Sequence, residues 1–185
     1  MIETIKQDAE ERMGKAVANL KKEFASIRTG KASPALLDRI VVDYYGVPTP
    51  LNQMAGVSAP EARMLLIQPW DKSALGNIEK AILKSDLGLT PTNDGSVIRL
   101  VIPQLTQDSR KELGKKVKKF GEEAKVAVRN IRRDSYDEIK KLEKAKEITE
   151  DDSKAAQDVI QKMTDKYVAE VDKAAANKEA EIMEI

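Results

Sequence analysis

The sequence predicts an α+β protein in which a long three-helix bundle is interrupted by a small β-rich domain. Three observations carry this prediction. Three long stretches repeat apolar residues every three or four positions, all seven prolines lie between the first and second stretch, and short β-type runs accompany these prolines. Aromatic residues make up only 4% of the 185 residues, which is low for a β-sandwich or barrel.

The first helix is predicted over residues 1–29. Its apolar residues form a seam at near-heptad spacing: Ile2, Ile5, Ala9, Met13, Ala16, Leu20, Phe24 and Ile27. The pattern stops at Thr29-Gly30, and glycine is a common helix terminator. We therefore expect the chain to leave the helix at this point.

Residues 32–104 are predicted to form an inserted β/α/β domain. Runs rich in β-branched residues indicate strands over 40–45, 64–67 and 97–102, and one apolar face indicates a helix over 72–84. Glycine, proline and asparagine between these segments indicate turns.

Two further amphipathic helices follow and are predicted to complete the bundle. Thr106 can cap the second helix and Thr149 the third, where Asp152 three residues later suits a variant of the capping box. One apolar stripe cannot be buried alone, so the three helices should pack against one another. The seams of these two helices are Leu113, Val117, Phe120, Ala124, Val128, Ile131, Ile139 and Leu142, then Ala156, Ile160, Met163, Tyr167, Val171, Ala174 and Ile182.

The predicted bundle therefore comprises residues 1–29 and 106–185. The chain leaves and re-enters it through two short connections, 30–31 and 104–106, and two such connections side by side favour a hinge. Helices of about 28 to 40 residues are roughly 40–60 Å long. We expect an elongated rod with the small domain attached at an angle.

Composition excludes several classes of function. The chain has no cysteine, which rules out disulfides, zinc–thiolate sites and cysteine nucleophiles, and it has no histidine, the commonest general base. No apolar run approaches the ~20 residues of a membrane span, and the acidic, amphipathic start does not resemble a signal peptide. We expect a soluble intracellular protein that is not an enzyme and has no metal or cofactor.

The net charge of +1 hides a basic segment between Arg110 and Arg133. This segment holds ten Lys or Arg against three acids, whereas residues 134–185 hold nine bases against 15 acids. At about 100° per residue, most of these bases fall on the helix face nearly opposite the apolar seam, and the scarcity of acids predicts few i,i+4 ion pairs. We call this face the basic stripe; its members are Lys111, Lys115, Lys118, Lys125, Arg129, Arg132 and Arg133.

A one-sided stripe that ends in an arginine cluster favours a polyanion site over an ordinary solvated helix face, which is the alternative interpretation. Arginine suits bidentate contact with phosphate. The few aromatics argue against stacking on single-stranded bases. Folded RNA contacted through its backbone fits better.

The segment Ile27–Pro34 is the second candidate. Gly30-Lys31 is similar to part of a phosphate-binding loop, but the complete glycine-rich pattern is absent. A helix stop and hinge is the simpler interpretation. Arg28 and Lys31 would extend the basic surface.

Four segments together resemble bacterial ribosome recycling factor. They are IRTGKASP at 27–34, DYYGVPTP at 43–50, SDLGL at 85–89 leading to NDG at 93–95, and VAVRNIRR at 126–133. They occur in the family's order and spacing, and the resemblance covers essentially the whole chain. Lys31 stands where many members have arginine, which keeps the charge but loses the guanidinium fork.

The resemblance implies an L-shaped, two-domain protein with roughly the outline of a tRNA. It implies binding to the large ribosomal subunit after termination, mainly through rRNA. Together with GTP-bound elongation factor G, such a protein splits the ribosome so that mRNA and tRNA leave. It would act as a cytoplasmic monomer and catalyse no bond chemistry itself.

The resemblance assigns the central rRNA contacts to Arg129, Arg132 and Arg133. The rest of the basic stripe supplies further predicted ribosome-binding residues, together with Arg110, Arg28 and Lys31. The family's hinge matches Thr29, Gly30, Lys31, Ala32, Gln104, Leu105 and Thr106. Elongation factor G is expected to push on the small domain and the hinge side.

Two other functions remain as alternatives. A helical adaptor or chaperone would present the acidic third helix to a protein partner, and its binding would tolerate salt. An enzyme that uses carboxylates alone would need two convergent acids, and the sequence offers no obvious pair.

Overall fold

The computed structural model describes residues 1–184 and divides into two compact units. One unit contains residues 1–24 together with those from 111 onward, and the other contains Ala25–Arg110. Within the described part of the chain, the first unit has helices as its only regular elements, and the second carries all six strands. A β-containing unit is therefore inserted after the first helix, in agreement with the predicted α+β class.

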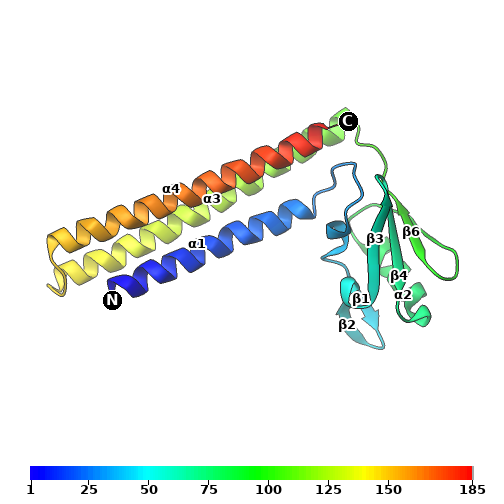
Figure 1. Cartoon of the computed structure of the whole chain (residues 1–185), viewed down its shortest axis with the longest axis horizontal. Helices are drawn as coiled ribbons and strands as arrows, with labels where there is room; N and C mark the ends of the chain where they lie inside the picture. The colour runs from blue at the N-terminus through cyan, green and yellow to red at the C-terminus, as the bar shows by residue number, and fades with distance from the viewer. Residues whose placement is uncertain (185) are drawn as a thin grey trace. The chain divides into compact units, whose positions relative to one another are not determined.

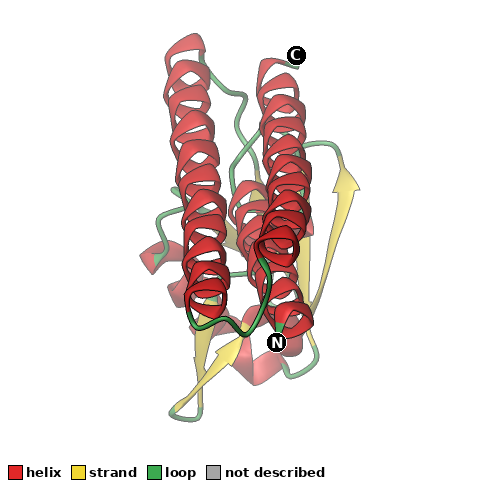
Figure 2. Ribbon diagram, turned by 90° about the vertical axis from the view of Figure 1, so that its left-hand side faces the viewer, coloured by secondary structure: helices red, strands yellow, loops and turns green. Residues whose placement is uncertain are grey.

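Three long helices form the first unit: α1 (Ile2–Ala25), α3 (Gln107–Lys144) and α4 (Glu150–Met183). They run side by side, with the short α3–α4 connection near the N-terminus (Figures 1 and 2). Each helix buries one stripe, and the buried residues include Met13 of α1, Val128 of α3 and Ile160 of α4. This mutual burial confirms the predicted three-helix bundle.

The helix starts follow the predicted caps. The Thr149 hydroxyl accepts from the Asp152 N–H at 3.0 Å, and the Asp152 carboxylate accepts from the Thr149 N–H at 3.3 Å, which completes a capping box. The Thr106 hydroxyl accepts from the Ser109 N–H at 3.0 Å just before α3. Because these bonds satisfy otherwise unpaired N–H groups, both helices begin where the sequence places them.

The end of the first helix differs from the prediction. The apolar seam runs to Ile27 and predicts a helix through residue 29, but α1 ends at Ala25. Ile27 is nevertheless buried, at 5% exposure. Its burial outside the helix explains why the apolar pattern continues past the helix end.

Contacts across the bundle lock the three helices together. The Tyr167 hydroxyl of α4 donates to Glu10 Oε1 of α1 at 2.7 Å. Arg12 of α1 donates to the Asp134 carboxylate of α3 at 3.2 Å. At Gly121, where α3 meets α4, an added Cβ would lie 3.8 Å from the Ala175 Cβ.

The second unit contains a four-stranded antiparallel sheet in the order β3-β4-β6-β5 and a separate β1-β2 hairpin. Its elements are β1 (Val41–Tyr44), β2 (Val47–Pro50), β3 (Ala55–Glu61), β4 (Met64–Pro69), α2 (Leu75–Lys84), β5 (Pro91–Asn93) and β6 (Ile98–Val101), with short 3₁₀ turns at Pro34–Leu37, Leu51–Gln53 and Lys72–Ala74. Ile67, Ile78, Ile82 and Leu100 are fully buried in its core.

The three predicted strands correspond to β1, β4 and β6, and the predicted helix to α2 with its preceding turn. The sequence does not predict strands β2, β3 and β5. All three are edge strands. They contain Pro48 and Pro50, Pro60, and Pro91 respectively, and proline is tolerated at sheet edges because it cannot donate to a ladder.

The two connections between the units are tied to one turn of the sheet. The Ala32 N–H donates to the Ala62 carbonyl at 2.7 Å, and the Ile102 N–H donates to the Arg63 carbonyl at 2.7 Å. Residues 62–63 form the β3–β4 turn. The two chain segments are therefore held side by side on the β-rich unit.

Candidate nucleic-acid interface

The basic stripe lies along α3. Its exposed members lie away from the buried seam, whereas Lys125 and Arg132 contact residues of α4 at the edge of the packing. Val117, Ala124, Val128 and Ile131 are buried. The exposed members of the stripe are Lys111, Lys115, Lys118, Arg129 and Arg133, whereas Lys125 and Arg132 are half-buried. Arg110, at the start of this segment, is also half-buried. The structure thus places the exposed members of the stripe along the outer face of one long helix.

Two lysines of the stripe are paired with acids one turn earlier. Lys115 lies 3.6 Å from Glu112, and Lys125 lies 3.4 Å from Glu122. Both pairs are separated by three residues rather than four. The prediction concerned i,i+4 pairs, and these two pairs do not contradict it. They add a feature that it did not cover, because i,i+3 neighbours also meet on a helix.

Lys125 has a second partner on another helix. Its Nζ lies 2.5 Å from Asp172 Oδ1 of α4. The hydrogen bond to this carboxylate raises the pKa of Lys125 above its usual value, against the opposing effect of burial. The ammonium group is thus committed to the bundle and offers little free charge to a ligand.

The three arginines of the VAVRNIRR segment have a different environment. No acidic side chain among residues 1–184 forms an ion pair with Arg129, Arg132 or Arg133, although Arg132 donates to Gln161 Oε1 of α4 at 3.1 Å. A guanidinium carries five N–H donors in a fixed fork that matches phosphate geometry. These three residues therefore form the part of the stripe best suited to bind phosphate.

Arg28 and Lys31 belong to the second unit. Arg28 is half-buried, and its Nη1 donates to the Leu87 carbonyl at 3.3 Å. This bond ties the segment after α1 to the loop that follows α2. Lys31 is exposed. The structure accordingly gives Arg28 a tethering contact that the sequence does not predict.

The predicted hinge residues lie in the two connections and around Gly30. Gly30 has a φ of +84°, a conformation that favours glycine, and a Cβ there would lie 3.6 Å from the Leu105 side chain. The predicted segments Thr29–Ala32 and Gln104–Thr106 thus meet at Gly30 and Leu105. The boundaries of the compact units fall slightly outside these segments, at residues 24–25 and 110–111.

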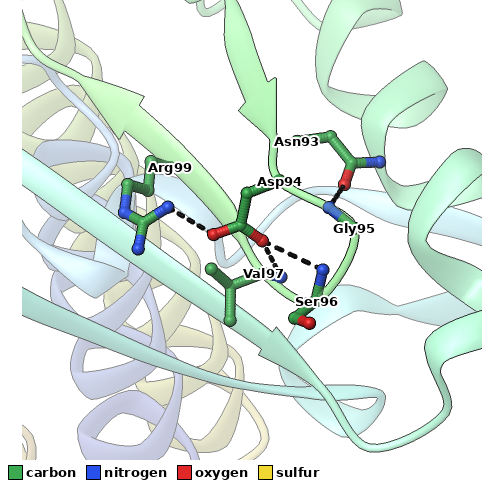
Figure 3. Close-up of polar contacts among 6 residues, drawn as sticks. All are labelled: Asn93, Asp94, Gly95, Ser96, Val97 and Arg99. Atoms are coloured by element: carbon green, nitrogen blue, oxygen red, sulfur yellow. Dashed lines mark hydrogen bonds and ion pairs between the residues drawn. The ribbon is translucent and has the colours of Figure 1, made fainter.

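Asp94, an acid of the small unit, serves local structure. Its carboxylate accepts from the N–H groups of Ser96 and Val97, both at 2.9 Å, and from Arg99 at 2.6 Å (Figure 3). These bonds, led by the two from the backbone, lower the pKa of Asp94 to about 2.

Within residues 1–184 no group of three or more acids could hold a metal ion.

Comparison with known proteins decides the family. The family model described as ribosome recycling factor matches residues 20–183. The chain belongs to the ribosome recycling factor family. A ribosome-recycling factor from Heliobacterium modesticaldum is 61% identical over 185 residues, and that from Geobacillus kaustophilus is 60% identical over 185 residues, each with all of both chains covered.

Solved structures of ribosome recycling factors have the same fold. A solution structure of the ribosome recycling factor matches with a TM-score of 0.81 and 44% identity, covering 100% of this chain and 98% of the other. A second match has a TM-score of 0.70 and 44% identity over the whole of both chains. It belongs to a set of models for the T. thermophilus ribosome recycling factor and the E. coli elongation factor G bound to the E. coli post-termination complex.

Sequence reasoning does not find the polar group beside Arg132. Gln161 and Tyr136 are not singled out, because a glutamine and a tyrosine on two different helices carry no motif. Only the packing of α4 on α3 brings them together, with the Tyr136 hydroxyl 3.2 Å from Gln161 Oε1.

Among residues 1–184, no helix is both long and apolar enough to cross a membrane.

Proposed function

We propose that this protein recycles ribosomes by binding the post-termination ribosome and splitting it together with elongation factor G and GTP. mRNA and tRNA then leave and the subunits return to initiation. The observation that carries the proposal is full-length membership of the ribosome recycling factor family, at 61% identity to a bacterial relative. The T. thermophilus relative, described together with elongation factor G bound to the post-termination complex, supports the same partners.

The basic stripe of α3 is proposed as the surface that docks on rRNA of the large subunit. Arg129, Arg132 and Arg133 are the central contacts, because none is neutralised by an acid among the described residues and each presents a guanidinium fork. Lys111 and Lys118 add exposed charge. Lys115 and Lys125 contribute less, because each is paired with an acid.

The two connections are proposed to act as the hinge of the recycling step. The helical unit would stay docked while elongation factor G displaces the β-rich unit, and the stiff helices would transmit the force to the contacts between subunits. Gly30 and Leu105 support this role, because both chain crossings meet at them. The L-shaped arrangement of the two units remains part of this proposal.

The protein is proposed to act as a cytoplasmic monomer without bond chemistry of its own. GTP hydrolysis then belongs to the elongation factor. The chain lacks both histidine and cysteine, so it carries neither of the side chains most used as general base or strong nucleophile at neutral pH.

Light scattering of post-termination ribosomes tests the function directly. The ribosomes are mixed with this protein, elongation factor G and GTP, and each component is omitted in turn. A fall in scattering only in the complete mixture is the expected result. Intact binding to ribosomes without splitting would argue for a different ribosome-bound role, and neither binding nor splitting would return the adaptor alternative to first place.

A further inference from the structure

Within residues 1–184, Arg132 is the one arginine of the VAVRNIRR segment with a side-chain partner on a neighbouring helix. Its Nη1 donates to Gln161 Oε1 of α4 at 3.1 Å. Arg129 and Arg133 lie on the same helix, are exposed, and make no comparable contact with another described residue. Arg132 is half-buried, and its bond to Gln161 is itself partly buried.

Further contacts fix the Gln161 amide that Arg132 touches. The Tyr136 hydroxyl lies 3.2 Å from Gln161 Oε1 and 3.3 Å from the Gln157 carbonyl, and its single hydrogen is shared between these two acceptors. On the other side of the amide, Gln161 Nε2 donates to Asp165 Oδ1 at 2.8 Å. Two donors converge on the amide oxygen and one acceptor faces the amide nitrogen, so the amide has only one orientation that satisfies all its neighbours.

The chemistry of this group suits a residue that must hold an arginine without neutralising it. A glutamine oxygen accepts one N–H of the guanidinium and leaves its positive charge intact. A carboxylate at the same position would form an ion pair, as Asp172 does with Lys125, and would then compete with an incoming phosphate. One bond to Gln161 leaves four of the five guanidinium N–H groups for a ligand.

We propose that Gln161 is a positioning residue for Arg132, which it holds in the orientation that binds an rRNA phosphate. This inference rests on the proposed function, because it presumes that Arg132 contacts rRNA. Tyr136 supports the same arrangement by donating to the amide oxygen. A preorganised guanidinium loses less side-chain entropy on binding, and that saving appears as affinity.

The test uses the full-length protein and purified bacterial large ribosomal subunits. Equilibrium affinity is measured at several salt concentrations for the wild type, Gln161→Leu, Arg132→Ala and the double variant. Gln7→Leu is the matched control, because Gln7 is an exposed glutamine on α1 and its substitution makes the same chemical change on a different helix. Thermal unfolding of each variant checks that the bundle is intact.

We expect Gln161→Leu to weaken binding about fivefold, the magnitude of one lost hydrogen bond, and Gln7→Leu to leave it unchanged. In the Arg132→Ala background, Gln161→Leu should have no further effect. If Gln161→Leu binds like the wild type while Arg132→Ala binds weakly, the positioning role is wrong and the proposed rRNA contact stands. An equal loss in both backgrounds would also overturn the positioning role.

A second variant tests the charge argument and keeps the proposal open to refutation if Gln161→Leu disturbs the fold. In Gln161→Glu, the glutamate is nearly isosteric with glutamine. Its carboxylate should keep the contact with Arg132 but neutralise the positive charge of the guanidinium. We expect weaker binding and a salt dependence reduced by about one phosphate contact. Wild-type affinity and salt dependence for Gln161→Glu would contradict the proposal. If Arg132→Ala itself binds normally, the assignment of Arg132 to rRNA fails first.

Discussion

Lys125 of α3 and Asp172 of α4 form an ion pair in which Nζ lies 2.5 Å from Oδ1. The lysine is only 19% exposed and the carboxylate is 57% exposed. The pair therefore lies at the edge of the helix packing, where it fastens α3 to α4. A residue that the sequence places on the ribosome-binding stripe thus has a structural partner, and this changes what its mutation should do.

Lys125→Ala should lower stability more than it lowers ribosome affinity. Loss of a partly exposed ion pair costs about 0.5–1 kcal/mol. Arg133→Ala should do the reverse, because Arg133 is exposed and no ion pair within the described residues involves it. Urea unfolding and large-subunit binding of both variants measure the two effects. If Lys125→Ala lost as much ribosome affinity as Arg133→Ala and kept wild-type stability, the structural role of Lys125 would be contradicted.

Asp172→Asn tests the same pair from the other side through pH. Pairing raises the pKa of Lys125 in the folded protein, so its contribution to stability is complete below the lysine's unfolded pKa and is lost as pH rises through the folded value. The stability difference between wild type and Asp172→Asn should therefore be constant at neutral pH and shrink in strongly alkaline solution. A difference that grows with alkaline pH would refute this linkage.

Tyr167→Phe should destabilise the bundle by about 1 kcal/mol, the usual value of one hydrogen bond. The Tyr167 hydroxyl donates to Glu10 at 2.7 Å. Burial, followed by this bond, raises the pKa of Tyr167 to about 12. The stabilising effect is thus present below the ordinary tyrosine pKa and is lost as pH rises towards 12. Denaturant unfolding of the wild type and Tyr167→Phe at neutral and alkaline pH measures the difference in their free energies of unfolding. If that difference is the same at alkaline as at neutral pH, the role of the hydrogen bond is contradicted.

Gly121→Ala should stabilise the protein, since alanine is favoured over glycine within a helix by about 1 kcal/mol. The new methyl would lie 3.8 Å from the Ala175 Cβ and 4.0 Å from Val171 Cγ1, which is ordinary van der Waals contact. Gly114→Ala is the control, because nothing among the described residues lies within 4 Å of its added Cβ. Thermal unfolding should show a similar rise in melting temperature for Gly121→Ala and Gly114→Ala. A loss confined to Gly121→Ala would mean that α3 and α4 pack more tightly than these distances indicate.

Gly30→Ala should slow ribosome splitting more than it weakens ribosome binding. A φ of +84° is strained for any residue with a Cβ, at a cost of about 1–2 kcal/mol. The connection would have to adjust where it meets Leu105, while the basic stripe on α3 is untouched. Splitting rates and large-subunit affinity separate the two effects. If splitting survives at the wild-type rate, Gly30 does not belong to the hinge.

Local and periodic features of this fold can be predicted from sequence. The seams of the three helices and the caps at Thr106 and Thr149 depend on neighbours within one or two turns, so spacing reveals them. Strand β4 is central in its sheet and contains a fully apolar run. The edge strands β2, β3 and β5 escape prediction because their prolines weaken the pattern that identifies a strand.

Contacts between elements distant in sequence are out of reach of such reasoning. The stripe itself follows from helical spacing. Its contacts with α4 do not, because Lys125 is paired with Asp172 and Arg132 donates to Gln161 only once the helices pack. Arg28 likewise bonds the carbonyl of Leu87, 59 residues away. Only the packed structure shows which charges of the predicted site are already engaged.

Docking on rRNA through the arginines of α3 is the central proposal for this protein. The most direct test is the affinity for large ribosomal subunits across a range of salt, compared between wild type and a variant with Arg129, Arg132 and Arg133 all changed to Ala. We predict steep salt dependence for the wild type, and for the variant weaker binding with a slope reduced by about two to three. Unchanged affinity and an unchanged slope would contradict the proposal.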